Sequence, residues 1–480
     1  MQRKFITNLF FLLLANVIVK PFWIFGIDRV FQNKIGAEEY GFYYALFSFS
    51  ILLNIFLDLG ITNYNNRNIA QHGHMLQRYF SSIIVLKFLL GIVYFSIVLI
   101  AIFLLEYDER YIQLLLILCF NQFLLSFLLY LRSNISGLQY FKTDSFLSVL
   151  DRVTVIIICG YFLWIATGVV FTVELFALAQ TAAYFFSCIV ALVILKGRVG
   201  RLKFRLNLPL LRIILKQSLP FALLVLLMSF YYRVDSVMIE RMLPDGDFQT
   251  GIYAQAYRLL DATNMLGFLF AGLLLPMFSK MISTKKDTTP LIKLSFNLIV
   301  VPSFILFILC YYYGYNIMSW LYTENVNEAA EILILLMGTF VAVASTYIFG
   351  TFLTANGSLK QLNIIALVGL GINLVLNNFL IPIYGPYGAA IATFITQLFV
   401  ISSQILIVKR LLKWTFNFNY LLRLSIFSLL LLAMSYLFYQ MSNTWIIKSL
   451  LTIILGFTMA IIFRIIEPQN MIRILKNKEQ

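Results

Sequence analysis

Residues 80–104 read FSSIIVLKFLLGIVYFSIVLIAIFL, and this stretch decides the fold. A helix that crosses the hydrocarbon core of a bilayer needs about 20 mainly apolar residues. The run is long enough to do so, and Lys87 is its single charged residue. It therefore predicts a transmembrane α-helix that ends just before the polar segment beginning at Glu106.

The rest of the chain is also rich in apolar residues and poor in charged ones. Its 480 residues are 61% hydrophobic and only 12% charged, whereas a soluble domain carries about 25% charged residues. Lipid must solvate much of this apolar surface, so the sequence predicts an all-α membrane protein. About 14 stretches pass the same length test. They are residues 5–30, 41–63, 80–104, 111–131, 146–166, 171–195, 213–239, 253–277, 291–314, 329–352, 361–381, 387–408, 419–438 and 444–464.

Cysteine and histidine residues predict neither a metal site nor redox chemistry. The four cysteines lie inside apolar runs and form no CxxC pair, which is typical of small buried hydrophobic residues. His72 and His74 lie together in a polar stretch and are interpreted as residues of a solvated loop. No metal and no resident cofactor are therefore predicted.

Basic residues indicate how the chain is threaded through the bilayer, because cytoplasmic loops carry an excess of Lys and Arg. With the N-terminus inside, the inner segments collect most of these residues, including those of 196–216 and the C-terminal tail. The outer loops are mainly acidic. Both termini are therefore predicted to be cytoplasmic. The net charge of +15 indicates this topology and an attraction to anionic lipid rather than nucleic-acid binding, since the basic residues are spread over many segments.

An internal echo indicates two similar halves. The segments GAEEYGFY (36–43) and GDFQTGIY (246–253) share Gly, Gly and Tyr at a constant offset, and each opens a predicted span. Two six-helix lobes of equal orientation would be related by an axis along the membrane normal, with substrate bound in a cavity between them. The predicted division is 1–196 for the N-lobe, 197–212 for a basic linker, 213–408 for the C-lobe, and 409–480 for two further helices and a basic tail.

Ionisable residues within the spans are the candidate functional groups, because such charges are costly in lipid and normally face a cavity or a partner. They concentrate in the first, second, seventh and eighth spans, which the internal symmetry would bring together. Cationic side chains there suit an anionic cargo, since Arg offers phosphate a bidentate partner. The predicted substrate-binding residues are Lys20, Arg29, Arg233 and Arg258. The predicted ion-coupling residues, which would carry H⁺ or Na⁺, are Asp58, Asp235 and Asp261.

Structural roles compete with these assignments. Asp58 is also placed to cap the inner end of its helix, and Arg29 to lie in the outer interface. Arg258 and Asp261 are spaced as an i,i+3 pair on one helix face. Near the inner surface, Lys87 is expected to snorkel to the inner headgroups. Asp151 and Arg152 are expected either to do the same or to pair with a neighbouring helix.

Three motifs carry a family resemblance. GFYYA (41–45) with FLDLGIT (56–62) resembles the second-helix signature of polysaccharide transporters. So do Leu219 and Pro220 leading to RVD (233–235), followed by GIYAQAY (251–257). The stretch NLVLNNFLIPIYGPYGAAIAT (373–393) is similar to the C-terminal pattern of the same proteins. In their order and spacing the motifs resemble Wzx-type O-antigen and capsule flippases of the MOP superfamily.

This resemblance implies a V-shaped pair of six-helix bundles in a bacterial cytoplasmic membrane. It implies that an undecaprenyl-diphosphate-linked oligosaccharide is moved from the cytoplasmic to the outer leaflet by alternating access. The expected partners are the lipid-linked oligosaccharide, membrane lipids and the polymerase and glycosyltransferases of polysaccharide assembly, and a monomer is expected. The predicted basic residues fit a diphosphate headgroup.

Two other functions compete with the flippase. A MATE-like cation exporter would need an acidic, aromatic cavity, whereas the central spans here are more basic than acidic. An enzyme of polysaccharide assembly would need a large outer loop for catalytic residues. The outer loops here are short, and no HExxH, GxSxG, P-loop or DxD-type element stands at a membrane edge. The sequence therefore predicts a transporter and not an enzyme.

Overall fold

The computed structural model describes residues 19, 21–62, 65, 69, 76–104, 109–138, 140–166, 170–199, 208–413 and 418–466. Every regular element within these residues is helical. The elements, in chain order, are η1 (Trp23–Asp28), α2 (Arg29–Ile35), α3 (Ala37–Leu52), η2 (Asn54–Leu57), α5 (Leu76–Leu104), α6 (Glu109–Gly137), α7 (Phe141–Gly160), η4 (Tyr161–Ile165), α8 (Val173–Val199), α9 (Leu208–Met242), α10 (Gly246–Ser283), α11 (Thr289–Leu321), α12 (Val326–Ala355), α13 (Leu359–Leu412), α14 (Phe418–Tyr439) and α15 (Trp445–Ile462).

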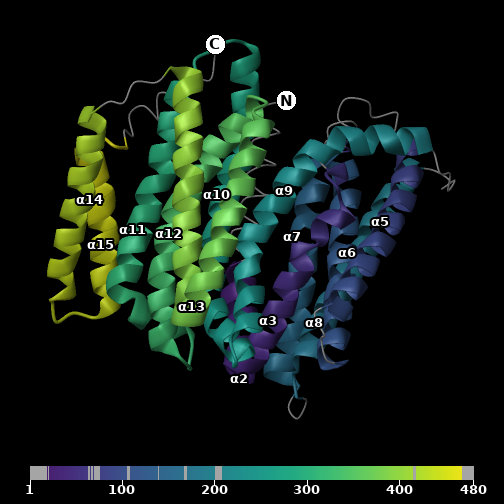
Figure 1. Cartoon of the computed structure of the whole chain (residues 1–480), viewed down its shortest axis with the longest axis horizontal. Coiled ribbons are helices and arrows are strands. Elements are labelled where there is room, and N and C mark those ends of the chain that lie inside the picture. Colours follow the sequence, from purple (N-terminus) through teal and green to yellow (C-terminus); the bar gives the residue numbers. More distant parts are fainter. Residues whose placement is uncertain are drawn as a thin grey trace. The chain divides into compact units, whose positions relative to one another are not determined.

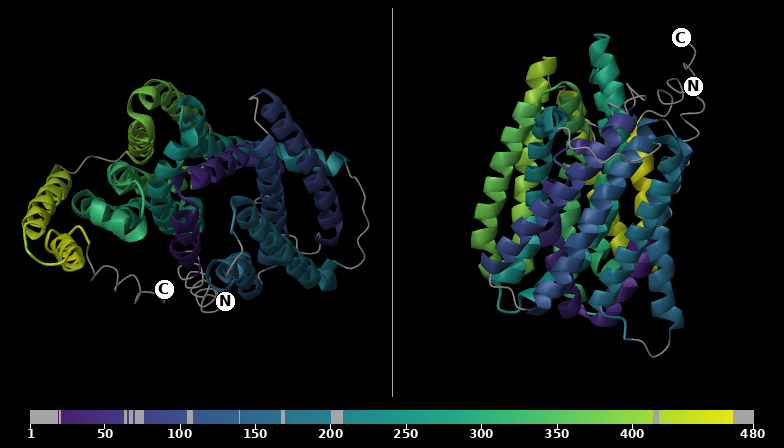
Figure 2. Two further views of the ribbon diagram at one scale, coloured as in Figure 1. Left: turned by 90° about the horizontal axis from the view of Figure 1, so that it is seen from below. Right: turned by 90° about the vertical axis from the view of Figure 1, so that its right-hand side faces the viewer.

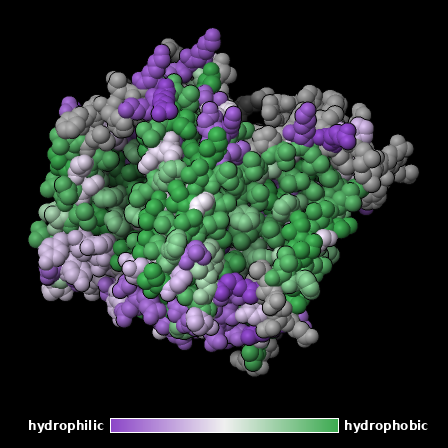
Figure 3. Space-filling model, viewed as in Figure 1, coloured by the Kyte–Doolittle hydropathy of each residue, from purple (hydrophilic) through white to green (hydrophobic). Residues whose placement is uncertain are grey.

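Ten of the described helices are long and apolar enough to cross a membrane. In the space-filling view, hydrophobic side chains cover the middle of the visible helices, and hydrophilic ones gather toward their ends (Figure 3). On α5, large apolar side chains such as Ile92, Ile100 and Phe103 are exposed, as expected of surface in contact with lipid. The predicted all-α membrane fold is confirmed. Most of the predicted first span, 5–30, lies outside the described residues.

The chain divides into two compact units, Met1–Ala254 and Gln255–Gln480. The division falls inside α10, and each unit is described by itself. The lobe boundaries predicted around 197–212 stay a prediction.

In the first unit, α6 packs against α8 and α3 packs against both α6 and α9 (Figure 1). Its core contains fully buried aliphatic side chains from several helices, including Ile83 of α5, Leu131 of α6 and Ala191 of α8. These residues fall inside the predicted spans. The apolar side chains that allow these spans to insert into lipid therefore also form the contacts between the helices.

The predicted second span, 41–63, is interrupted toward its inner end. The helix α3 stops at Leu52, and the short 3₁₀ helix η2 follows. Leu59 and Gly60 then adopt positive φ angles of 46° and 77°. Gly60 lies against α9, because a Cβ at this position would stand 2.8 Å from the backbone oxygen of Ser218. The break therefore leaves backbone carbonyl groups without their regular helical partners.

The two echo segments pack directly against each other at the start of α3 and of α10. A Cβ on Gly41 would stand 1.7 Å from the backbone oxygen of Asp247, and a Cβ on Gly251 would stand 1.9 Å from that of Ala37. The contact is reciprocal, because Ala37 precedes Gly41 by as many residues as Asp247 precedes Gly251. Such a self-complementary contact is what a two-fold relation between equivalent segments produces. Within the first unit, it supports the duplication predicted from the echo.

In the second unit, α11 packs on α12 and α12 on α13. The C-terminal helices α14 and α15 lie side by side (yellow in Figures 1 and 2) and contact α11. Their shared core includes Ile308 of α11, Leu431 of α14 and Ala460 of α15, all of them 0–1% exposed. The additional pair predicted at 419–438 and 444–464 is therefore packed on the bundle within this unit.

The element α13 contains a sharp reversal of the chain. Gly385 has φ 56° and ψ −139°, which is not a helical conformation. A Cβ on Gly388 would stand 2.3 Å from the backbone oxygen of Leu380, and one on Gly369 would stand 3.1 Å from Val400 Cγ2. The two arms of α13 therefore fold back on each other, which confirms the turn predicted between the spans 361–381 and 387–408.

Substituting Gly385 by Ala is expected to destabilise this hairpin. Its backbone conformation lies close to a region that only glycine adopts readily, and such strain costs about 1–3 kcal/mol. We expect a lower thermal unfolding temperature of the detergent-purified protein. Gly314→Ala in α11 is the matched control, because a Cβ there would meet no atom closer than 3.7 Å. An equal effect of the two substitutions would contradict the role of the turn conformation.

Candidate functional site

Arg233 of α9 lies against the second span of the first unit. Its Nη1 donates a hydrogen bond to the hydroxyl oxygen of Tyr44, at 3.0 Å. Tyr44 is fully buried on α3, and Arg233 is only partly exposed. The guanidinium predicted to bind substrate is therefore held by the protein interior rather than directed into lipid.

A stacked pair of tyrosines connects Arg233 with the first span. The ring of Tyr40 stacks on that of Tyr44, with centroids 6.2 Å apart and planes inclined by 17°. The hydroxyl of Tyr40 donates to Asp28 Oδ2 at 2.7 Å, and both of these residues are fully buried. Four residues thus form a continuous series from the first span to the seventh. We call them the tyrosine bridge: Asp28, Tyr40, Tyr44 and Arg233.

Arg29 follows Asp28 at the start of α2. Its Nε is buried and has no hydrogen-bond partner among the described residues. A buried N–H group without an acceptor is costly, and in native structures such groups are normally satisfied by protein, water or ligand. Arg29 therefore carries an unsatisfied donor, and it is the residue that follows Asp28 of the tyrosine bridge in the sequence.

Arg152 of α7 was not predicted as a site residue. Its guanidinium carbon lies 5.5 Å from the ring centroid of Trp23 and 5.8 Å from that of Tyr184, within the range of a cation–π contact. Its Nε is 3.6 Å from Asp151 Oδ2. Of the two roles expected from the sequence, packing on a neighbouring helix is thus confirmed. The sequence did not identify its two aromatic partners, Trp23 and Tyr184, which lie far from Arg152 along the chain.

Asp235 is a buried carboxylate two residues beyond Arg233. It is 1% exposed and accepts a 2.9 Å hydrogen bond from the hydroxyl of Tyr253. The bond ties α9 to the start of α10, beside the reciprocal glycine contact. The structure thus places Asp235 in a packed contact. Its predicted role as an ion carrier stays a prediction.

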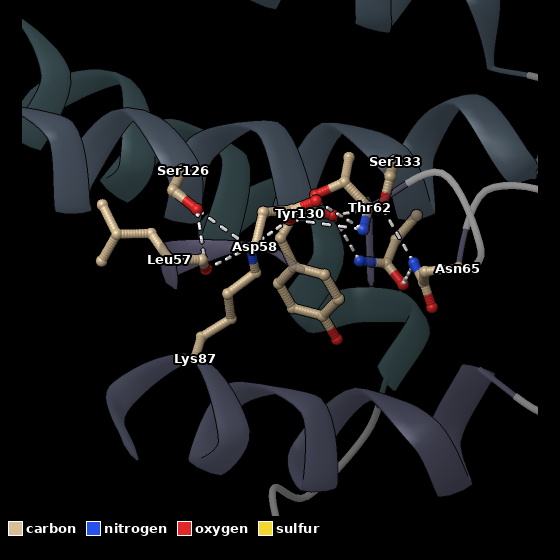
Figure 4. A network of polar contacts seen from close by, with 9 residues as sticks. Leu57, Asp58, Thr62, Asn65, Lys87, Ser126, Tyr130 and Ser133 are labelled. Atoms are coloured by element: carbon tan, nitrogen blue, oxygen red, sulfur yellow. Dashed lines mark hydrogen bonds and ion pairs between the residues drawn. The ribbon is translucent and has the colours of Figure 1, made fainter. Parts of the chain in front are cut away.

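Asp58 lies in a second polar cluster of the first unit, at the break after η2 (Figure 4). It forms an ion pair with Lys87 of α5, and it accepts hydrogen bonds from the backbone and side chain of Thr62. The bond from the Thr62 backbone caps the residues that follow the break, whereas the predicted role was to cap the inner end of the span 41–63, and that role stays a prediction. Lys87 is 1% exposed, so the prediction that it snorkels to the headgroups is wrong. Snorkelling fails because the carboxylate of Asp58 and the backbone carbonyl of Leu57 lie within reach of the ammonium.

The two remaining described candidates belong to the second unit. Arg258 Nη1 lies 3.9 Å from Asp261 Oδ2 on the same face of α10, as their spacing predicted, and Arg258 is only 9% exposed. Lys20 lies outside the described residues. Of the predicted residues in the first unit, Arg233 therefore belongs to the tyrosine bridge, Arg29 follows its Asp28 in sequence, and Asp58 lies in a different cluster.

Several solved structures share this fold. The lipid II flippase MurJ, in an inward closed conformation, is similar with a TM-score of 0.73 and 17% identity, over 94% of this chain and 97% of that chain. A MOP superfamily transporter from Pyrococcus furiosus, described as having a binding pocket of reverse polarity, gives a TM-score of 0.59 and 17% identity, over 85% and 95%. The Vibrio cholerae MATE transporter VcmN, in its bent form, gives a TM-score of 0.58 and 16% identity, over 85% of this chain and 97% of that chain.

These similarities and the apolar helices define a multi-pass membrane protein with the fold of MOP superfamily flippases and transporters. Residues 5–282 match the model of a family described as polysaccharide biosynthesis protein, and the chain belongs to that family. The resemblance found in the sequence motifs is confirmed. A search of curated proteins found no match.

Proposed function

We propose that the protein is a flippase that moves an undecaprenyl-diphosphate-linked oligosaccharide from the cytoplasmic to the outer leaflet of a bacterial inner membrane. Alternating access would carry the sugar across, and H⁺ or Na⁺ would drive the cycle. The cargo would belong to O-antigen, lipopolysaccharide or capsule assembly. Both termini would be cytoplasmic.

The observation that carries this proposal is the buried, unsatisfied Nε of Arg29, the residue that follows Asp28 of the tyrosine bridge. Arg233 at the other end of the bridge supplies a second guanidinium, held by Tyr44. A diphosphate has acceptor oxygens in the geometry that guanidinium groups bind best. The aromatic rings beside these residues are also suited to pack against the isoprenoid or the sugar rings.

A cation exporter and an enzyme are less well supported. The carboxylates of this region, Asp28 and Asp235, are each bonded to a tyrosine hydroxyl, and the arginines around them would repel a cationic drug. We propose transport without covalent change of the cargo, by a monomer that works beside glycosyltransferases and a polymerase.

The test is a flipping assay with the purified full-length chain in liposomes. A fluorescent undecaprenyl-diphosphate-linked oligosaccharide is incorporated in both leaflets, and a membrane-impermeant quencher is added outside. We expect nearly all of the fluorescence to be quenched with the protein, against about half in protein-free liposomes with cargo equally divided between the leaflets.

Three outcomes would contradict the proposal. The first is quenching no greater than in protein-free liposomes. The second is protein-dependent movement of a cationic dye but not of the glycolipid, which would favour an exporter. The third is a changed mass of the recovered glycolipid, which would indicate an enzyme.

A further inference from the structure

The break after η2 leaves the backbone carbonyl of Leu57, inside the first unit, without its regular helical partner. In a regular helix the carbonyl of Leu57 would accept the N–H of Ile61, but that N–H donates to the carbonyl of Asp58 instead, at 2.9 Å. The Leu57 carbonyl accepts hydrogen bonds from Lys87 Nζ at 3.0 Å and from Ser126 Oγ at 3.1 Å. The broken helix thus presents an oxygen ligand toward α5 and α6.

The ammonium of Lys87 occupies the centre of this group of oxygens (Figure 4). It donates to the Leu57 carbonyl at 3.0 Å, to Ser126 Oγ at 2.9 Å and to the carboxylate of Asp58. The side chain is 1% exposed, so it reaches these oxygens from inside the packed unit. The ammonium is therefore surrounded by one carbonyl, one hydroxyl and one carboxylate oxygen.

This oxygen set is of the kind that binds a hard cation. Small cations without a preference for nitrogen or sulfur take carboxylate and carbonyl oxygens, and unwound helix segments within membranes coordinate Na⁺ through such carbonyls. Lys87 provides a single positive charge at that position. The charge is tethered to α5 and cannot leave the protein.

We infer that Lys87 is a built-in cation that fills a small monovalent-cation site formed by Leu57, Asp58 and Ser126. The native chain therefore needs no Na⁺ at Asp58, and any coupling ion must use another position. Shortening Lys87 opens the site to Na⁺ or to a small alkylammonium. This inference concerns a binding site and does not depend on the proposed cargo.

A purely structural ion pair makes a different prediction. Removing one partner of a buried pair leaves the other charge uncompensated, which is strongly destabilising. If the surrounding oxygens could not hold a free ion, this loss would be the same in every salt. If they can, a bound ion stabilises the folded variant by mass action. The response of stability to the identity of the cation therefore separates the two interpretations.

The test compares thermal unfolding of the full-length chain and its Lys87→Ala variant in detergent. Each is titrated with NaCl or methylammonium chloride, with choline chloride keeping the ionic strength constant. We expect the unfolding temperature of Lys87→Ala to be low in choline and to rise saturably with Na⁺. For a chain of 480 residues, the rise should reach about 3 °C at a Na⁺ concentration about 100 times the Kd. The native chain should show no such rise.

Two controls make the result specific. The double variant with Asp58→Asn and Lys87→Ala lacks the carboxylate, so its unfolding temperature should no longer respond to Na⁺. Lys216→Ala removes an exposed lysine of α9 and should behave as the native chain. If Lys87→Ala is not recovered folded, Lys87→Gln, which fills more of the space, is titrated in its place.

The inference is wrong if the Lys87 variants show no saturable response to Na⁺ or methylammonium. It is equally wrong if the native chain responds as the variants do, or if the double variant keeps the response. Failure of both single variants to fold even in Na⁺ would also overturn it, because the ion should replace the lost ammonium. A failed flipping assay would leave these outcomes unchanged.

Discussion

Replacing Arg233 by Glu is expected to reduce glycolipid movement to background while the protein still inserts into the membrane. The substitution removes the hydrogen bond from Nη1 to Tyr44 and puts a negative charge where the proposed diphosphate binds. A hydrogen bond to a charged group contributes about 1.5–3 kcal/mol. Its loss alone corresponds to roughly a 10- to 100-fold effect, and repulsion of an anionic cargo adds to it. The measurement is surface glycan in a strain whose own copy is deleted, together with the abundance of the variant in the membrane.

Two further variants separate charge from folding. Lys216→Glu reverses an exposed charge on the same helix, α9, and should leave surface glycan near the native level. Tyr44→Phe removes only the hydroxyl that accepts from Arg233 and should give an intermediate decrease. Normal surface glycan in Arg233→Glu would remove the cationic site from the mechanism. So would an equal loss in Lys216→Glu.

Replacing Gly41 by Ala is expected to cause the largest loss of stability. The new Cβ would stand 1.7 Å from the backbone oxygen of Asp247, so α3 and the start of α10 would have to separate. Overpacking of this kind typically costs about 1–3 kcal/mol and more where backbone must move. At the upper end, this corresponds to a fall of about 3 °C in the unfolding temperature of a 480-residue chain. Thermal unfolding of the detergent-purified variant measures it, and the yield of folded protein should also fall.

Gly371→Ala is the matched control for this prediction. Gly371 lies in the helical first arm of α13, and a Cβ there would meet no atom within 4 Å. Alanine in a helix is favoured over glycine by about 0.5–1 kcal/mol, so the control should be unchanged or slightly stabilised. A Gly41→Ala variant as stable as this control would show that the two helices separate without cost.

The positions of the helices could be predicted from the sequence because apolar length is a local property. The predicted spans 171–195 and 329–352 correspond to α8 (Val173–Val199) and α12 (Val326–Ala355). The break after Leu52 could not be predicted in this way. It depends on contacts from other helices, since Lys87 satisfies the freed carbonyl of Leu57.

The candidate site was predicted less completely than the fold. The cost of a charge in lipid singled out Arg233, which the structure places against Tyr44, and its role in substrate binding stays a prediction. Its partner Tyr44 is 189 positions away in sequence, and no local spacing identifies such a pair. Lys87 was misinterpreted for the same reason, because the pairing with Asp58 depends on how two helices meet. Pairings between distant segments have to come from a structure.

The reciprocal contact of Gly41 and Gly251 also limits how mutations there can be repaired. Each glycine faces main-chain atoms of the opposite segment, Asp247 or Ala37, and every amino acid carries the same main chain. No side-chain exchange across the contact can therefore make room for a larger residue. Selection for intragenic suppressors of a Gly41 or Gly251 mutant should return true reversions, or distant changes that move a whole helix, but no substitution of the facing residue.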